Sequence, residues 1–299
     1  LLGRIEELKK EIEGIKTQKT ALENEIQEAT DLEAWVLASI PLQPLVVEII
    51  RSMGPQSEIV DFTLERDAET PSQLRIGLKL NTVSDKQIEQ TLDVIRGLNY
   101  REFNQTQTRV QGNLDYKASL LWQDPTSNRQ TTGTDVREKT SATEAEEENT
   151  RAEEKALETQ LGVEKELLAD LQRQSADLLE FVAKWKPYFA LMSEQQSAET
   201  GISMIVREQA MLTLSQRYEQ VPHKISNKDI DALPVLVRAS LLFDDNYTKL
   251  LNWIGNMEKI KPTMRIGRLA LSKGSRGDDL RMELVLEVPL RKEEPGKKL

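Results

Sequence analysis

The 299-residue chain has no cysteine and a single histidine, His223. The lack of cysteine excludes disulfide bonds, thiolate metal ligands and cysteine nucleophiles. A lone histidine cannot form a multi-histidine metal site, and it argues against a Ser–His–Asp triad. We therefore expect no metal centre and no cofactor.

Basic residues are fewer than acidic ones, 40 against 50, which gives a formal net charge of −10. A nucleic-acid-binding surface is normally basic, so we expect no nucleic-acid partner. Apolar runs that approach the roughly 18 residues needed to span a bilayer are missing, as is any signal peptide. Because the sequence starts at Leu1 inside a heptad pattern, we interpret it as a fragment or processed product. Any contact with a membrane is expected through an anchor upstream of it.

Catalytic motifs are the last notable absence. The acidic pairs Asp244-Asp245 and Asp278-Asp279 fall in polar turns. Carboxylates there are usually solvated, whereas an acid–base pair needs environments that split its pKa values. The turn Gly274–Gly277 fits neither a Walker loop nor a dinucleotide-binding fingerprint. The sequence therefore predicts no enzyme.

Two charged heptad runs dominate what is present. They predict coiled-coil helices at residues 1–40 and 151–200. The apolar positions that we expect to form their seam are Ile5, Leu8, Ile12, Ile15, Leu22, Ile26, Leu157, Leu161, Leu168, Leu171, Leu178 and Val182. Lys19, Glu164 and Ser175 interrupt these stripes, and such polar residues set the register at some cost in stability.

A heptad helix cannot bury its apolar stripe alone. The alternatives are an intramolecular helical hairpin, a partner chain and a second copy of this chain. Pairing between chains, as a homodimer or heterodimer, is favoured over the hairpin.

Each heptad run leads into a compact segment that mixes strands with a helix. Residues 41–123 show the order helix, β, β, α, β, β, with the clearest strand at Leu74–Leu80 and an amphipathic helix at Ile88–Leu98. Residues 201–290 repeat this kind of order. Alternation that is apolar on one side only predicts mostly antiparallel sheets with helices on one face.

Two segments differ in composition from these units. Residues 124–150 are rich in Ser, Thr, Gly, Asn and Glu, which predicts a flexible polar and acidic linker between two domains. Residues 291–299 form a polar tail.

The order of a heptad helix and a small ββαββ unit resembles the periplasmic region of bacterial assembly-platform proteins. These are the PilN and PilO proteins of type IV pili and their type II secretion counterparts. The first half resembles PilN in Ile59–Leu64, Leu74–Leu80, Ile88–Leu98 and the stretch from Phe103 to Trp122. The second half resembles PilO in Leu233–Val237, Phe243–Tyr247, Leu250, Trp253, Ile254 and Ile266–Leu271. Two units in one chain and the missing membrane helix depart from the family pattern.

The resemblance implies an α+β fold with two ferredoxin-like (ββαββ-type) domains, each preceded by a long coiled-coil helix. It also implies a non-enzymatic scaffold of a type IV pilus or secretion assembly platform, periplasmic and anchored in the inner membrane. Its partners would be other assembly-platform or pilus proteins. The alternative is a ligand-binding or sensory module in which the coiled coils are signalling helices.

Overall fold

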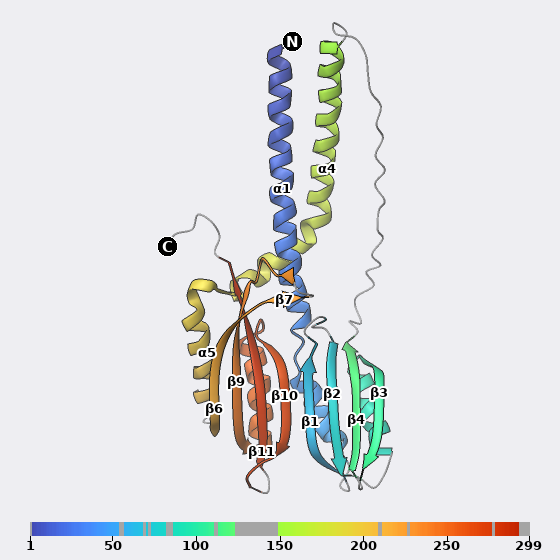
Figure 1. Ribbon diagram of the computed structural model, residues 1–299, viewed down its shortest axis with the longest axis vertical. Helices are drawn as coiled ribbons and strands as arrows, with labels where there is room; N and C mark the ends of the chain where they lie inside the picture. Colours follow the sequence, from blue (N-terminus) through green and yellow to red (C-terminus); the bar gives the residue numbers. More distant parts are fainter. Residues whose placement is uncertain are drawn as a thin grey trace. The chain divides into compact units, whose positions relative to one another are not determined.

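The chain divides into two compact units in the computed structural model (Figure 1). A helical unit comprises residues 1–30 and 128–184, and a sheet unit comprises residues 31–127 and 185–299. The residues that the structure describes are 2–53, 57–67, 70, 73–81, 86–110, 113–122, 149–208, 211–225, 228–276 and 279–292. The predicted linker, apart from its last two residues, and residues 293–299 of the predicted tail lie outside the described residues.

The helical unit is built from two helices of equal length, α1 (Leu2–Ala38) and α4 (Asn149–Trp185), each of 37 residues. Both are rich in Ala, Glu, Lys and Leu, which have high helix propensity. The two helices lie side by side and run in the same direction, since Lys9 pairs with Glu153 and Lys19 with Glu164 (Figure 1). Of the alternatives, the structure therefore shows the less favoured pairing within one chain, as a parallel helical pair and not an antiparallel hairpin. Pairing between chains stays a prediction.

The sheet unit contains one large sheet. Its strands are β1 (Glu58–Arg66), β2 (Gln73–Asn81), β3 (Tyr100–Val110), β4 (Asn113–Trp122), β5 (Ala190–Leu191), β6 (Thr213–Pro222), β9 (Val235–Asn246), β10 (Arg265–Lys273) and β11 (Asp279–Arg291). The hydrogen-bonded order is β3-β4-β2-β1-β10-β11-β9-β6, and neighbours in this order are antiparallel. The short β5 pairs in parallel with the end of β11. A separate two-stranded ribbon joins β7 (Lys224–Ile225) and β8 (Lys228–Asp229).

The sheet consists of two halves with the same topology. The N half carries β1, β2, β3 and β4, and the C half carries β6, β9, β10 and β11. With the strands of each half numbered one to four in chain order, both halves have the spatial order 1-2-4-3. The predicted ββαββ segments at 41–123 and 201–290 thus share one continuous antiparallel sheet, joined where β1 pairs with β10.

Four amphipathic helices cover one face of this sheet: α2 (Gln43–Ser52), α3 (Lys86–Gly97), α5 (Gln195–Glu208) and α6 (Tyr247–Ile260) (Figure 1). One helix, α3 or α6, connects the second and third strands of each half, and α2 or α5 precedes its first strand. Alternate strand residues point into this layer, as with Leu74, Ile76 and Leu78 of β2, while Arg75 and Lys79 are exposed. The period of two therefore separates a core face from a polar face.

The second heptad run ends earlier than predicted. The helix expected over 151–200 stops at Trp185 and is followed by the 3₁₀ turn Lys186–Tyr188, by β5 and by a second 3₁₀ turn, Met192–Glu194. Pro187 lacks the backbone N–H that a continuing helix needs, and its ring clashes with the preceding turn. A new helix, α5, then starts at Gln195.

One helical stretch among the described residues, Gly3–Ser52, contains a window that is long and apolar enough to cross a membrane by length and composition. Part of this stretch is α2, whose Leu45, Val46 and Ile49 are buried in the core of the sheet unit. In the structure 33% of the window is buried, and a single stretch of this kind is weak evidence for a membrane span.

Candidate protein-interaction site

The seam of the helical unit is a small apolar cluster. Leu8, Ile12 and Ile15 of α1 pack with Leu161 of α4, and all four are at most 9% exposed. Partly buried side chains extend this cluster on the α4 side. Heptad positions of two parallel helices interdigitate in this way, so the spacing of the sequence is sufficient to produce the contact.

The twelve predicted seam residues all lie on α1 or α4. Six are buried: Ile5, Leu8, Ile12, Ile15, Leu161 and Val182. Six are half-buried: Leu22, Ile26, Leu157, Leu168, Leu171 and Leu178. The stripe of α1 is therefore deeply buried from Ile5 to Ile15, half-buried at Leu22 and Ile26, and buried again at Ala29, which is 1% exposed.

The polar interruptions of the heptad stripes meet in this unit. Lys19 Nζ lies 3.7 Å from Glu164 Oε2, and both side chains are largely buried, at 30% and 17% exposed. Ser175 is 4% exposed and donates its hydroxyl to the carbonyl of Leu171, one turn back on α4. A charged pair at opposed core positions forms only in one register, so it fixes how the two helices align.

Two further ion pairs flank the seam. Lys9 Nζ lies 2.8 Å from Glu153 Oε1, and Lys165 Nζ lies 2.6 Å from Glu11 Oε1. Their side chains are about half exposed, so each pair adds little to stability. They contribute to the direction and pairing of the helices more than to their free energy of association.

Helix α4 also exposes apolar side chains outside the seam. Val163 and Leu167 are 51% and 47% exposed, and they stand one turn apart on the same side of the helix. An exposed apolar pair at i and i+4 beside a coiled-coil seam is the kind of surface on which a further helix packs.

The two halves of the sheet meet at an internal joint. Here Asp61–Glu65 of β1 pair with Arg268–Ser272 of β10 in antiparallel register. Phe62 and Leu64 of β1 and Leu269 and Leu271 of β10 are buried at this joint. The joint therefore combines a backbone ladder with a continuous apolar core.

A row of alternating charges crosses the C half on the polar face. In the strand register Glu287 of β11 lies between Arg265 of β10 and Arg238 of β9. Its carboxylate is 2.7 Å from Arg265 Nη2 and 3.0 Å from Arg238 Nη2. Burial opposes ionisation of Glu287, but the two guanidinium groups outweigh it and lower its pKa.

Trp35, near the end of α1, covers this charged row. The guanidinium of Arg265 lies 3.9 Å from the centre of its ring, and His223 meets the ring edge-on at 5.2 Å. The Trp35 indole N–H donates to the carbonyl of Thr263 at 2.8 Å. Burial lowers the pKa of His223, whose Nδ1 is 3.0 Å from the carbonyl of Leu233. His223 is thus a packing residue of this cluster.

Glu258 connects α6 of the C half with α2 of the N half. Its carboxylate accepts hydrogen bonds from the backbone N–H of Leu42 at 2.6 Å and of Gln43 at 3.2 Å, at the N-terminus of α2. Burial raises its pKa to about 7, although these N–H groups and Arg66 favour the charged form. The buried Arg66 donates to the carbonyl groups of Ile266 and Ile40.

The acidic pair Asp244-Asp245 has structural roles. Asp244 is 2% exposed and accepts from the backbone N–H of Ser275, from its hydroxyl, and from Arg281. The bonds from Ser275 lower the pKa of Asp244. Asp245 is oriented instead towards Lys249, at 2.7 Å. The two carboxylates therefore hold separate turns. Asp278 of the other acidic pair lies outside the described residues.

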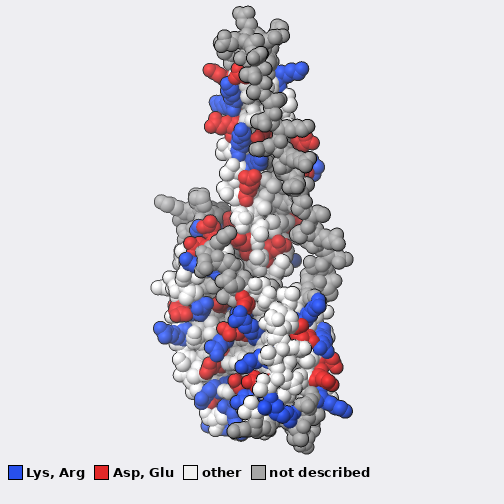
Figure 2. All heavy atoms as spheres, turned by 45° about the vertical axis from the view of Figure 1, so that its right-hand side comes forward, with Lys and Arg blue, Asp and Glu red and all other residues white. Residues whose placement is uncertain are grey.

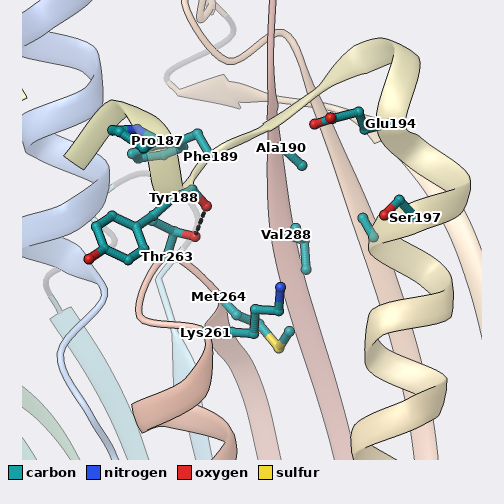
Figure 3. Close-up of a pocket in the computed structure, with 11 residues that line it drawn as sticks. Pro187, Tyr188, Phe189, Ala190, Glu194, Ser197, Lys261, Thr263, Met264 and Val288 are labelled. Atoms are coloured by element: carbon teal, nitrogen blue, oxygen red, sulfur yellow. Dashed lines mark hydrogen bonds between the residues drawn. The ribbon is translucent and has the colours of Figure 1, made fainter. Parts of the chain in front are cut away.

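A hollow of about 210 Å³ opens in the C half (Figure 3). Its wall is fixed by Thr263 Oγ1, which donates to the carbonyl of Tyr188 at 3.0 Å. Lys261 and Glu194 enter from different elements, and no ion pair between them is found in the described part of the chain. Among the described residues, no group of three or more His, Asp or Glu side chains is placed to hold a metal ion.

Sequence reasoning missed the buried charged residues. Alternation along β11 places Glu287 on the polar face with Glu283, but nothing in the pattern shows that Glu287 is buried at 8% exposure. An Arg at the end of an apolar alternation, as at Arg66 after Phe62 and Leu64, was the available signal.

Comparisons of this chain with protein-family models, with curated proteins and with solved structures gave no match.

Proposed function

We propose that this chain is a non-enzymatic scaffold of a type IV pilus or type II-like secretion assembly platform. In this proposal it is periplasmic and anchored to the inner membrane upstream of Leu1. It carries a PilN-like and a PilO-like ferredoxin-like domain on one chain, and its partners are other platform or pilus proteins.

The observation that supports this proposal most is the double repetition. Each half of the chain has a 37-residue helix, a shorter helix and a ββαββ segment with strand order 1-2-4-3. The two long helices pair in parallel through their heptad positions. A platform built from two related neighbours would need this arrangement, since both helices would then begin at the same membrane.

The surface for a further partner is the exposed side of α4. Val163 and Leu167 lie outside the seam, so an added helix could cover them without separating α1 from α4. Such packing would bury both side chains and extend the helical pair to a bundle.

The test measures binding of the chain to candidate platform proteins, by co-purification and by analytical ultracentrifugation. V163E together with L167E should abolish binding while the free energy of unfolding changes little, because both residues are exposed. E154Q with E158Q on the same helix is the control and should leave binding intact. Absence of binding by the wild type, combined with a strict monomer at tens of micromolar, contradicts the proposal.

A second candidate function, a ligand-binding or sensory module, is favoured by one hollow. A space of about 340 Å³ lies between α2, β1, β10 and the start of α6, beside the internal joint, and Ile50, Met53, Ile59 and Leu280 are among its lining residues. Ligand pockets are typically apolar with few polar groups. A small-molecule thermal-shift screen that stabilises the wild type, but not an I59W variant filling the hollow, would support this function.

A further inference from the structure

We propose that copies of this chain join head to tail through the two outer edges of the large sheet. In this contact β6 and α5 of one copy meet β3 and α3 of the next. The inference concerns the sheet unit alone and stands independently of the proposed function.

The outer strands present long exposed edges. Among the described strands, β3 pairs only with β4, and β6 only with β9. Every residue from Asn104 to Val110 of β3 is exposed, and Asn104–Thr108 carries no charge. Edge strands are usually protected by charged residues, by proline or by a covering element. This part of β3 lacks the first two, and among the described residues no strand pairs with its outer side. In β6 the uncharged stretch is shorter, Thr213–Gln216, and Arg217, Glu219 and Pro222 follow it.

The internal joint shows which edges fit each other. It pairs β1, the first strand of the N half, with β10, the third strand of the C half. The outer edges are the remaining first and third strands, β6 of the C half and β3 of the N half. An outer contact between β6 and β3 therefore repeats the type of pairing that the chain already makes internally.

Strand direction allows the same repetition. The eight strands from β3 to β6 alternate in direction, because every neighbouring pair is antiparallel. The first and the last strand consequently run in opposite directions. When a second copy is placed edge to edge with its helices on the same face, its β3 is antiparallel to β6, as β10 is to β1.

Bulges at the outer edges do not prevent this pairing. β3 has a bulge between Phe103 and Thr106, and β6 has one between Thr213 and Ser215. Both strands of the internal joint carry bulges too, β1 at Ile59/Asp61 and β10 at Ile266/Arg268, and they still pair over five residues. Each outer strand continues for at least five residues beyond its bulge.

The helix layer leaves a groove at the outer edge beside α3. At the internal joint α2, which precedes β1, packs beside α6, and the Gln43 side chain occupies the space that a Cβ on Gly255 would need. The equivalent place beside α3 is a groove of about 580 Å³. Ile88, Leu92 and Tyr116 form the apolar part of its wall, and charged and polar side chains form the rest: Glu89, Asp93, Arg96, Gln105, Thr106 and Gln107. The hydroxyl of Tyr116 is buried and has no hydrogen-bond partner among the described residues.

The opposite edge exposes apolar side chains that would meet the apolar part of this groove. Met204 of α5 is 54% exposed, and Leu212 and Leu214 at the start of β6 are 56% and 50% exposed. Since α5 precedes β6 as α2 precedes β1, pairing of β6 with β3 brings α5 beside α3. The exposed residues of one edge would then cover the groove of the other. A contact between two different surfaces of the same chain is heterologous, so it produces rings or filaments and not closed twofold dimers.

The test uses one broken edge at a time. M204K with L214K places charge on the β6 edge, and Q105K with Q107K places the same charge in the groove at the β3 edge. All four residues are exposed, so thermal unfolding of each variant should match the wild type. I260K, which changes another exposed apolar residue of the sheet unit, is the matched control.

Sedimentation gives the expected results. The measured molecular mass of the wild type and of I260K should increase with concentration above the 34.0 kDa of one chain, and it should exceed that of a dimer. Each edge variant alone should remain a monomer, and a one-to-one mixture of the two should form a dimer and stop there. The β6 edge of one variant then binds the β3 edge of the other, and the two charged edges repel.

Hydrogen exchange localises the contact. Amides of β3 and β6 should gain protection with concentration, whereas those of the central β2 should not. A wild type that stays monomeric overturns the proposal, as does a mixture that stays monomeric or an edge variant that still self-associates. Partner binding through Val163 and Leu167 is measured separately, so failure here does not decide the proposed function.

Discussion

The two units of this chain bury their side chains to very different extents. The sheet unit has a continuous core in which Phe62, Phe243 and Trp253 are at most 1% exposed. In the helical unit Leu8, Ile12, Ile15 and Leu161 form a small cluster with partly buried neighbours. Ile5, Ala29 and Val182 are buried in this unit as well. The apolar core of the sheet unit is therefore large enough to stabilise it without a partner. The helical pair buries fewer apolar side chains, so a partner that covered more of them would increase its stability further.

Charged residues show the same contrast. In the sheet unit Arg265 and Glu287 form a pair that is at most 10% exposed, with Arg238 as a second partner. In the helical unit the side chains of Lys19 and Glu164 are more exposed, at 30% and 17%. On the face of the molecule seen in Figure 2, other Lys, Arg, Asp and Glu side chains are interspersed. We therefore expect the loss of one partner to lower the free energy of unfolding more for a buried pair than for an exposed one.

The largest effect is expected from E287A in the sheet unit. Removal of this carboxylate leaves the buried guanidinium of Arg265 without its partner, which costs about 3–5 kcal/mol in the free energy of unfolding. Urea unfolding followed by tryptophan fluorescence measures the change, because Trp35 lies on Arg265. The control is E283A, which removes an exposed carboxylate on the same strand and should cost about 0.5 kcal/mol or less. Equal losses in the two variants would contradict a role for burial.

A smaller effect on the free energy of unfolding is expected as Glu258 ionises with rising pH. Its pKa of about 7 in the folded protein lies above its ordinary value of 4.5, so folding favours the protonated form. The resulting stability is complete below about pH 4.5 and is lost as the pH rises towards 7, by about 3 kcal/mol. E258Q should remove this loss, because glutamine stays neutral throughout.

Other titrating groups change stability in different ways. The lowered pKa values of Glu287 and Asp245 give stability that is lost at acid pH, below their ordinary values near 4. The lowered pKa of His223 costs stability as the pH falls below 6.5, opposite in direction to Glu258. The informative quantity is therefore the wild type minus E258Q between pH 5 and 8, measured by urea unfolding, with E48Q on α2 as control. A difference independent of pH would contradict the prediction.

Much of the fold could be predicted from the sequence. Heptad spacing indicated both long helices, and alternation indicated β2, β9 and β11, because periods of 3.5 and 2 are set by local backbone geometry. Pairing of β1 with β10 could not be predicted, since it joins residues about 200 positions apart and depends on edges that look alike in sequence. The parallel direction of the helical pair was equally hidden, because a heptad stripe reads the same for either direction.

The candidate site was predictable to a lesser degree. The apolar seam residues could be named because each follows from its spacing. Glu258 and Glu287 could not, since a carboxylate in a helix or at a polar strand position usually faces water. Their burial depends on residues far away in the chain, Leu42 for Glu258 and Arg265 for Glu287.

The smallest effect, and the most informative about the helical unit, is expected at Lys19 and Glu164. K19E brings two carboxylates together in the parallel register and should lower the free energy of unfolding of the helical unit by about 0.5–1 kcal/mol. E164K should do the same, and the double exchange should restore most of the loss. Circular dichroism at increasing temperature gives the coupling energy from this cycle.

The same cycle at Lys9 and Glu153, which are more exposed, should show weaker coupling that disappears in high salt. Purely additive losses at Lys19 and Glu164 would mean that the helices align in another register, since only the parallel register places these two residues opposite each other.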